Sequence, residues 1–452
     1  MKAVGVKKLN NDRFTLSQIC MLIIITLAGV LLSVSFHIPL FIGFLPGFVF
    51  LISLIKRKGR SLREIWKICS KGISKTQTVI LILFLVSFIL PSWYEAGTIQ
   101  VLVSVALQII TPDHFFLLSF IIAMLFSMTL GTSIGTLSAV GIPIMSSAIS
   151  IDLAPHIVAG ALLSGAFVGD RTSPFSSAFQ LLSHTVEISN KKQFHAMALT
   201  TIPAILISIV FYSYLDSQYG LNQGDLTAFN WEELSLMKLL PPLILMVVVL
   251  FRKGIVYAFL SSIIVASIIS LIDGSTFYQL FHALFFGIKG MGGGLINMYM
   301  LLIFLALAGA YNGLLEEYRV IQPLVDGWLH QSKTLVEDSV KTIIATFGIS
   351  LIAANQTLPI ILTGRTLLPH WINNRTKADL ARVMADSTML FPGMIPWSVL
   401  TIMCSTVLGL PVTTYLPYAI FLWSLPFITI VVSILIQSRS NKRSKGYVQR
   451  AS

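Results

Sequence analysis

Long apolar blocks dominate the hydrophobic pattern of the chain. Several approach the roughly 20 residues that an α-helix needs to cross about 30 Å of hydrocarbon. They are too long for strands, and they lack the alternation of apolar and polar positions that is typical of an outer-membrane barrel. The clearest blocks are Ile19–Phe36, Leu40–Ile55, Val79–Leu90, Phe115–Leu130, Met197–Tyr214, Leu239–Phe251 and Ile255–Ile272. The pattern predicts an all-α, polytopic integral membrane protein with about ten to twelve transmembrane helices.

Three breaks rich in Gly, Thr, Ser or Pro interrupt the apolar sequence. They are Gly131-Thr-Ser-Ile-Gly-Thr136, Gly169-Asp-Arg-Thr-Ser-Pro174 and Ala354-Asn-Gln-Thr-Leu-Pro359. In lipid, irregular backbone survives only where protein or water satisfies its polar groups. We therefore expect these breaks to line a cavity.

Similar residues recur about 220 positions apart in the two halves of the chain. The pairs are Phe84 and Phe304, Glu95 and Glu316, Phe126 and Phe347, and Thr136 and Thr357, with Asp170 and Asp386 at a slightly shorter spacing. The recurrence predicts two copies of one helical unit, arranged as inverted repeats with broken or re-entrant helices that meet at a midplane site.

The distribution of charge along the chain predicts its orientation. Lys and Arg gather before the first span, after the second and in the tail, whereas the stretch from Asp216 to Glu233 carries only acidic charges. Lys and Arg concentrate in cytoplasmic loops, so both termini are expected in the cytoplasm. The predicted segments are a basic cytoplasmic N-terminus (1–16), a first transmembrane repeat region (17–215), an acidic external loop (216–237), a second transmembrane repeat region (238–437) and a basic cytoplasmic tail (438–452).

Composition narrows the class of protein further. Hydrophobic residues make up 55% of the chain and charged residues 11%, against about 25% charged in a soluble domain. The net charge of +12 flanks the spans, so it indicates topology and argues against nucleic-acid binding. The basic segment Lys56–Lys75 is expected on anionic lipid headgroups. Cys20, Cys69 and Cys404 are too few and too scattered for a disulfide framework or a metal site.

Asp170 is the first candidate for an ion site. It follows the apolar run Ile157–Gly169 and precedes Thr172, Ser173 and Pro174, where a hydroxyl before Pro favours a new helix start. An intramembrane carboxylate at such a break can bind Na⁺ or H⁺ but not both cheaply, and this competition is a physical basis for exchange. Hydroxyls supply the oxygen ligands that hard cations prefer. The alternative is that Asp170 only neutralises a buried Arg.

A second set of candidates lies in the other half of the chain. Asp386 precedes Ser387 in apolar sequence, and its alternative role is a helix cap near the surface. Asn355 and Gln356 offer amide oxygens at the third break. Arg365 and Arg382 could meet a substrate carboxylate or pair with a carboxylate of the protein itself.

One motif resembles that of an enzyme. Gly131-Thr-Ser133-Ile-Gly135 matches the G-x-S-x-G pattern of serine hydrolases. The soluble version requires a strand before the Ser, whereas a spanning helix is expected here. An intramembrane serine protease using Ser133 is therefore an outside alternative, because no His lies nearby in sequence. No Walker A, H-E-x-x-H or Rossmann pattern is present, so we expect no enzyme activity, no cofactor and an ion gradient as the energy source.

The sequence resembles the NhaC family of sodium/proton antiporters over roughly residues 15–435. The matching motifs are Gly131-Thr-Ser-Ile-Gly-Thr136, Gly165-Ala-Phe-Val-Gly-Asp-Arg-Thr-Ser-Pro174, Gly293-Gly-Leu-Ile-Asn-Met298, Ala354-Asn-Gln356, Gly364-Arg365, Leu380-Ala-Arg-Val-Met-Ala-Asp-Ser387 and Ile395-Pro-Trp397. The resemblance implies inverted repeats with broken helices and exchange of Na⁺ for H⁺. Some relatives couple ions to organic acids, as in malate–lactate exchange, and others carry amino acids.

The chain departs from the family pattern at one position. The family commonly continues Ser-Pro-Leu-Ser-Asp, whereas this chain reads Ser173-Pro-Phe-Ser-Ser177. The resemblance therefore implies one carboxylate fewer than usual, which bears on ion stoichiometry and raises the weight of an organic substrate.

The prediction is an antiporter of the cytoplasmic membrane that exchanges Na⁺ for H⁺ by alternating access. Asp170 is the expected Na⁺ ligand and proton carrier, with Ser133, Thr172 and Ser173 beside it. Asn355, Asp386 and Ser387 are the corresponding residues of the second repeat. The alternative is a Na⁺- or H⁺-coupled transporter of an organic acid or amino acid that uses Arg365 or Arg382. The expected partners are Na⁺, H⁺, the lipid bilayer and, in the alternative, a small organic anion. No nucleic acid is expected, and a homodimer is left open.

Overall fold

The computed structural model describes residues 14–36, 38–102, 114–219, 235–251, 253–288, 294–325, 332, 334–353 and 355–451. Side chains at 34, 150, 236, 249, 250, 324, 325 and 439–451 lie outside this description. The regular elements within it are helices. The prediction of an all-α polytopic membrane protein is confirmed.

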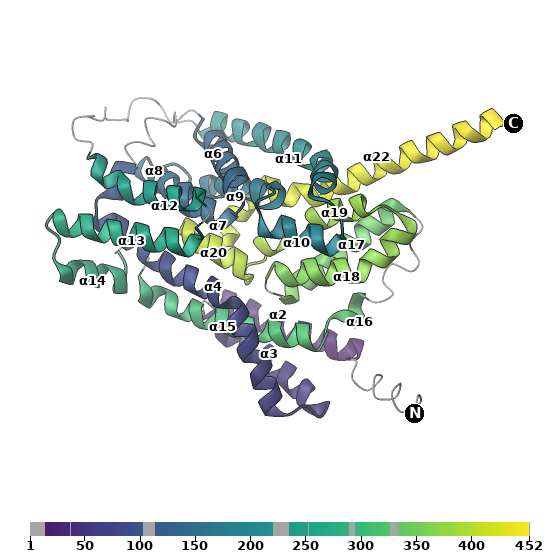
Figure 1. The fold of residues 1–452 in the computed structure, drawn as a ribbon, viewed down its shortest axis with the longest axis horizontal. Helices are drawn as coiled ribbons and strands as arrows, with labels where there is room; N and C mark the ends of the chain where they lie inside the picture. Colours follow the sequence, from purple (N-terminus) through teal and green to yellow (C-terminus); the bar gives the residue numbers. More distant parts are fainter. Residues whose placement is uncertain are drawn as a thin grey trace.

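The first half of the chain folds into a series of helices with one π-helical turn (Figure 1). They are α2 (Leu16–Ser35), α3 (Leu40–Arg57), α4 (Leu62–Glu95), α6 (Phe115–Leu130), α7 (Ser133–Thr136), the π-helix η2 (Leu137–Gly141), α8 (Ile142–Ser150), α9 (Pro155–Thr172), α10 (Ser177–Val186) and α11 (Asn190–Tyr219).

The second half continues in the same way and ends in a helix whose last turns project from the bundle (Figure 1). Its elements are η4 (Leu236–Leu239), α12 (Leu240–Leu250), α13 (Ile255–Ile272), α14 (Phe277–Phe286), α15 (Leu295–Glu317), α16 (Gln322–Val325), α17 (Leu335–Ala353), α18 (Thr357–Asn374), α19 (Lys377–Ala385), η5 (Phe391–Gly393), α20 (Val399–Leu408), α21 (Val412–Tyr415), η6 (Leu416–Tyr418) and α22 (Ile420–Ala451).

Broken and short helices explain why the number of full-length spans is smaller than the number predicted from the sequence. In the described part of the chain, seven helices are long and apolar enough to cross a membrane. An eighth results if Val399–Leu408 and Val412–Tyr418, bent by 82°, form one span. Four shorter apolar helices accompany them, among them Phe115–Leu130. The prediction of ten to twelve spans includes such short helices as whole spans.

Helix boundaries recur at the spacing seen in the sequence. α4 ends at Glu95 and α15 at Glu317, while α7 begins at Ser133 and α18 at Thr357. These positions again lie about 220 residues apart, a spacing compatible with the predicted repeat. In both halves a helix, α6 or α17, is followed by a short break and then a new helix start. The two copies and their inverted orientation stay a prediction.

The predicted boundary of the acidic loop falls inside a helix. α11 continues to Tyr219, so Asp216 lies in its last turn, and residues 220–234 lie outside the described part of the chain. The Asp216 carboxylate accepts hydrogen bonds from the backbone amides of Phe116 (2.8 Å) and Leu117 (3.0 Å). These are free amides of the first turn of α6, which an acidic side chain stabilises. Asp216 therefore ties the end of α11 to the start of α6.

Glycines bring two long helices of the bundle, α4 and α15, into backbone contact. α4 and α15 lie side by side (Figure 1). A Cβ added at Gly72 of α4 would meet the backbone of Gly309 and come within 3.1 Å of Cα of Gly313, both on α15. Small residues at such crossings are the usual way for membrane helices to approach closely, because burial from lipid supplies little driving force.

We expect Gly72→Ala to destabilise the protein by about 1–3 kcal/mol, because rigid backbone atoms meet the new methyl group. Gly348→Ala in α17 is the matched control, since a Cβ there meets nothing within 4 Å. Thermal unfolding of the purified variants in detergent measures both changes. A Gly72→Ala variant as stable as Gly348→Ala would contradict the close contact of α4 and α15.

Candidate ion-binding site

The helix that carries Asp170 is enclosed by the rest of the bundle. Every residue of α9 from Ile157 to Thr172 is buried. On the side facing α6, a Cβ at Gly165 or Gly169 would collide with the α6 backbone. The hydroxyl of Ser127 in α6 donates to the carbonyl of Ala166. This contact fixes the last turn of α9, and Asp170 with it, against the end of α6.

The first break turns toward Asp170. α6 ends at Gly131, whose φ of 69° is the left-handed conformation that glycine adopts without strain. α7 then begins at Ser133, and η2 follows directly. Such π-helical turns occur frequently at functional sites. The backbone amide and the hydroxyl of Ser133 both hydrogen-bond the Asp170 carboxyl.

The third break reaches the same carboxyl from the other half of the chain. Gln356 precedes α18, and its side chain hydrogen-bonds Asp170. Its amide nitrogen also donates to the carbonyl of Met389, at 2.8 Å. Breaks from both halves therefore converge on one buried carboxyl group. Asp170 is only 8% exposed, and within the described residues no Lys, Arg or His side chain forms an ion pair with it.

Arg171, the basic residue next to Asp170 in the chain, pairs with a different carboxylate. Neighbouring residues on a helix point about 100° apart, and Arg171 faces Asp386 at the end of α19. The two side chains form an ion pair, and both are fully buried. Arg171 also donates to the Thr200 hydroxyl (3.1 Å) and to the carbonyl of Ala385 (3.3 Å). The structure therefore does not support the alternative in which Asp170 itself neutralises a buried Arg.

Arg382 stabilises the same region from the other side. Its guanidinium donates to the hydroxyl and the carbonyl of Thr429 in α22 (2.7 and 3.0 Å) and to the hydroxyl of Ser433 (3.1 Å). It also pairs with Asp379 at 3.5 Å. Two buried arginines thus face two carboxylates, and the charges of this cluster balance. Asp386 is the residue that caps α19, but it is fully buried and does not lie near the surface.

Other predicted ligands bond to the backbone around the site. The Thr172 hydroxyl donates to the carbonyl of Val168 (2.5 Å), and the Ser173 hydroxyl donates to that of Met128 (2.8 Å). The Ser387 hydroxyl donates to Val383 (2.7 Å). The Asn355 oxygen accepts from the amide of Leu358 (2.9 Å), which starts α18. Of the predicted ligand set, only Ser133 is brought to Asp170 by a direct hydrogen bond.

Two further predictions fall outside the buried site. Arg365 is exposed on α18. Ser177, where the resemblance leads one to expect an Asp, is the exposed first residue of α10. That helix starts later than Pro174 suggested, because the Ser176 hydroxyl caps it by accepting from the amide of Phe179 (3.2 Å). Ser177 is not among the residues that hydrogen-bond Asp170.

Some participants were not in the predicted set. Gln356 was noted in the sequence only as a polar residue of the third break. Arg171 was visible beside Asp170, but its partner lies more than two hundred residues along the chain, and no local pattern connects them. Thr200 has no sequence signal at all, since it is an ordinary hydroxyl inside the long apolar helix α11.

We expect Asp386→Asn to destabilise the protein by about 3–5 kcal/mol, because it leaves Arg171 buried without its counter-charge. Replacing both members in Arg171→Leu/Asp386→Leu removes the uncompensated charge and should recover much of that loss. Thermal unfolding in detergent compares the two variants. An Asp386→Asn protein as stable as the wild type would show that the pair contributes little to stability.

Comparison with known proteins identifies the family. A model of the Na⁺/H⁺ antiporter family matches residues 13–189 and 169–435. The chain is 27% identical to the Na(+)/H(+) antiporter NhaC of Alkalihalophilus pseudofirmus, over 94% of this chain and 96% of that protein. It is 27% identical to NhaC of Bacillus subtilis, with 92% and 96% covered, and 26% identical to the Malate-2H(+)/Na(+)-lactate antiporter of the same organism, with 93% and 94% covered. The resemblance seen in the motifs is confirmed, and the chain belongs to the Na⁺/H⁺ antiporter family.

Proposed function

We propose that the protein is a secondary antiporter that exchanges Na⁺ for H⁺ and that Asp170 is the group both ions share. The observation that carries this proposal is a buried carboxyl group without a basic partner among the described residues. The other carboxyl groups buried in the described helices have partners: Asp386 pairs with Arg171, Asp338 with His370 and Arg375, and Asp216 caps α6. Asp386 and Asp338 are ion-paired and two backbone amides of α6 hold Asp216, whereas Asp170 lies where helix breaks from both halves of the chain meet.

A buried carboxylate without a counter-charge is costly, because burial removes its hydration. Two small cations can remove that cost. H⁺ neutralises the group by covalent attachment, and Na⁺ neutralises it by coordination to oxygen atoms. The two cannot occupy the carboxylate together, so binding of one releases the other. Exchange follows once the site opens to each side of the membrane in turn.

The groups around Asp170 suit a weakly held hard cation. Ser133 supplies a hydroxyl oxygen, and Gln356 carries an amide oxygen, both ligands that Na⁺ accepts. We assign these two residues to direct coordination. Thr172, Ser173 and Asn355 then support the helix ends from which the ligands extend. Asp386 and Ser387 belong to the neighbouring charge cluster and hold α19 in register with α9.

Exchange with an organic anion is the second candidate, because one relative is named a malate/lactate antiporter. A carboxylate substrate needs a cationic partner inside the protein. The two buried arginines next to the site are already bonded, Arg171 to Asp386 and Arg382 to Thr429 and Ser433. Arg365 is exposed on α18. These contacts favour an inorganic cation as the cargo. The serine protease interpretation has no support, since the relatives are transporters and the Ser133 hydroxyl bonds a carboxyl group.

Location in the cytoplasmic membrane with both termini inside is part of the same proposal. It is supported by the end of α3 and the first half of α4, where Lys and Arg outnumber acidic residues. The helix breaks at Gly131 and Gln356 and the π-helical turn η2 are the segments best suited to rearrange during alternating access.

We expect Asp170→Asn to abolish proton movement driven by Na⁺, because the amide neither binds a proton nor balances a cation. Asp152→Asn is the matched control: Asp152 is exposed, and its φ of 54° is one that Asn tolerates. Proteoliposomes with a preset proton gradient and an internal pH dye, given Na⁺, Li⁺ or K⁺ in turn and then malate and lactate, measure the effect. Normal exchange by Asp170→Asn would remove Asp170 from the mechanism, and a response only to the organic acids would favour the second candidate.

We expect Ser133→Ala and Gln356→Leu to raise the apparent KM for Na⁺ by about tenfold each while the maximal rate changes less, because each removes one ligand worth roughly 1.4 kcal/mol. Since Na⁺ and H⁺ compete, the apparent KM for Na⁺ should also rise as the pH falls toward values where the site takes up a proton. Initial rates over a range of Na⁺ concentrations and pH values test both points. A KM independent of pH would contradict a shared site.

A further inference from the structure

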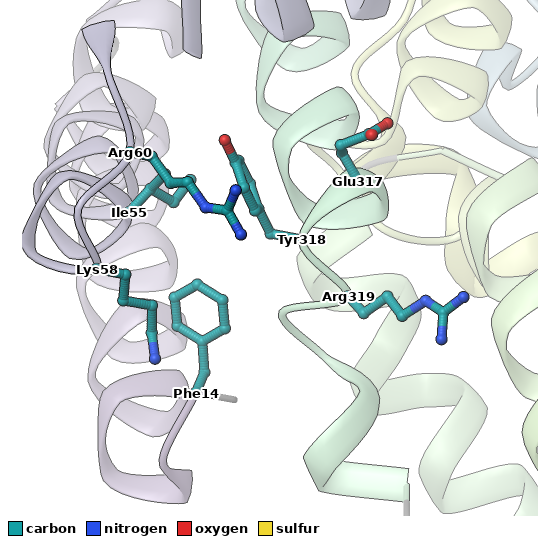
Figure 2. Close-up of a pocket in the computed structure, with 7 residues that line it drawn as sticks. All are labelled: Phe14, Ile55, Lys58, Arg60, Glu317, Tyr318 and Arg319. Atoms are coloured by element: carbon teal, nitrogen blue, oxygen red, sulfur yellow. The ribbon is translucent and has the colours of Figure 1, made fainter. Parts of the chain in front are cut away.

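A small cavity lies where three helix ends meet, away from the ion site. It is lined by Phe14 before α2, Ile55 and Lys58 at the end of α3, Arg60 before α4, and Glu317 to Arg319 at the end of α15 (Figure 2). Its volume is about 170 Å³, below the roughly 300–1,000 Å³ of pockets that enclose whole organic ligands. The space therefore suits a compact group such as a phosphate.

Two cationic side chains extend into this cavity. Lys58 and Arg60 are half-buried, whereas the neighbouring Lys56 and Arg57 are exposed. The Lys58 ammonium lies 4.6 Å from the centre of the Phe14 ring, and the Arg60 guanidinium lies 5.7 Å from that of Tyr318. Figure 2 shows both groups beside these rings. The rings hold the two cations at the cavity and shield them from solvent on one side.

The opposite wall carries Tyr318 and the Glu317 carboxylate, while Glu64 forms an ion pair with Arg60 at 3.4 Å. Tyr318 caps the end of α15, and its hydroxyl donates a hydrogen bond to Glu64 at 3.4 Å. Burial and the charge of Glu64 raise the pKa of Tyr318 to about 12, so its hydroxyl stays protonated. The Glu317 carboxylate points away from Lys58 and Phe14, and the Arg319 guanidinium extends outward from the same wall (Figure 2).

An apolar groove begins one or two turns from the cavity on the same helices. It has a volume of about 530 Å³ and runs between α3, α4 and α15, past Phe48, Ile52, Trp66 and Ile303. Ile52 lies about one turn before Ile55 on α3, and Leu62 of the groove follows Arg60 closely. The side chain of Trp66 is 75% exposed. A groove of this kind matches an acyl chain in shape and chemistry.

We propose that the cavity binds the phosphate of an anionic phospholipid, with Lys58 and Arg60 as its donors and one acyl chain in the adjoining groove. Arg donates to phosphate through several N–H groups at once, and Lys does so as a point charge. The basic ends of α3 and α4 lie on the face expected at the cytoplasmic leaflet, where anionic lipids gather. The groove is what favours a lipid over a free phosphate ion, since a soluble anion makes no use of it.

This lipid site is independent of Na⁺/H⁺ exchange at Asp170. It links the α2–α3 hairpin to the end of α15 through a ligand that belongs to the membrane. Its occupancy is therefore measurable by binding alone, and failure of the lipid proposal leaves the ion site untouched.

The test uses quenching of Trp66 fluorescence in the full-length protein in phosphatidylcholine nanodiscs. Phosphatidylglycerol with brominated acyl chains is added in one series and brominated phosphatidylcholine in another. The Trp66→Phe protein, measured in parallel, supplies the signal of the other tryptophans. We expect phosphatidylglycerol to quench Trp66 at an about tenfold lower fraction of lipid, because Lys58 and Arg60 attract its negative headgroup.

Lys58→Gln/Arg60→Gln should lose this preference. Lys67→Gln/Lys71→Gln removes the same charge from exposed positions of α4 outside the cavity and should keep it. Equal quenching by the two lipids in the wild type, or an equal loss in both double variants, would overturn the site. Inorganic phosphate, compared with chloride at the same ionic strength, should not displace the brominated lipid. If it does, the cavity takes free phosphate and the lipid assignment is wrong. Unfolding temperatures in phosphatidylcholine confirm that the variants are folded.

Discussion

The absence of water from the bilayer interior is the constraint on which the rest of this structure depends. Each buried polar group must find its partner within the protein. Asp216 caps α6, Arg382 bonds α22, and Arg171 pairs with Asp386. Satisfied groups of this kind become rigid connections between helices. Asp170 is buried among them without a basic partner in the described part of the chain, and on this ground we propose it as the group that an incoming cation stabilises.

Uncharged contacts between α6 and α9 determine the position of Asp170. Gly165 and Gly169 let the backbone of α6 lie against α9, and Ser127 locks the contact with a hydrogen bond. The end of α6 is thereby held next to the last turn of α9. The chain then leaves α6 through the left-handed turn at Gly131, and the next helix, α7, begins at Ser133. A close helix crossing and one glycine turn thus bring a hydroxyl and an amide to the carboxyl group.

Rigid and movable parts lie next to one another at the site. The Arg171–Asp386 pair and the bonds of Arg382 join α9, α19 and α22 into one unit. Ser133 and Gln356 belong to the starts of α7 and α18, where the backbone is not held by a continuous helical ladder. An ion that binds between them bridges the two kinds of element. Under the proposed function, Na⁺ or H⁺ at Asp170 alters the contacts between a rigid unit and two broken helices, which is what coupling of binding to alternating access requires.

The sequence by itself determined the all-helical class, the three breaks and the position of Asp170 at one of them, because hydropathy, glycine and proline act locally. It also predicted Ser133 correctly as a neighbour of Asp170, since both lie at breaks that must be satisfied by protein. Only the tertiary structure decided that Arg171 faces Asp386, that the Thr172 and Ser173 hydroxyls bond backbone carbonyls, and that Ser177 and Arg365 are exposed. These outcomes depend on helix rotation and on contacts between distant segments, which the order of residues along one helix does not specify.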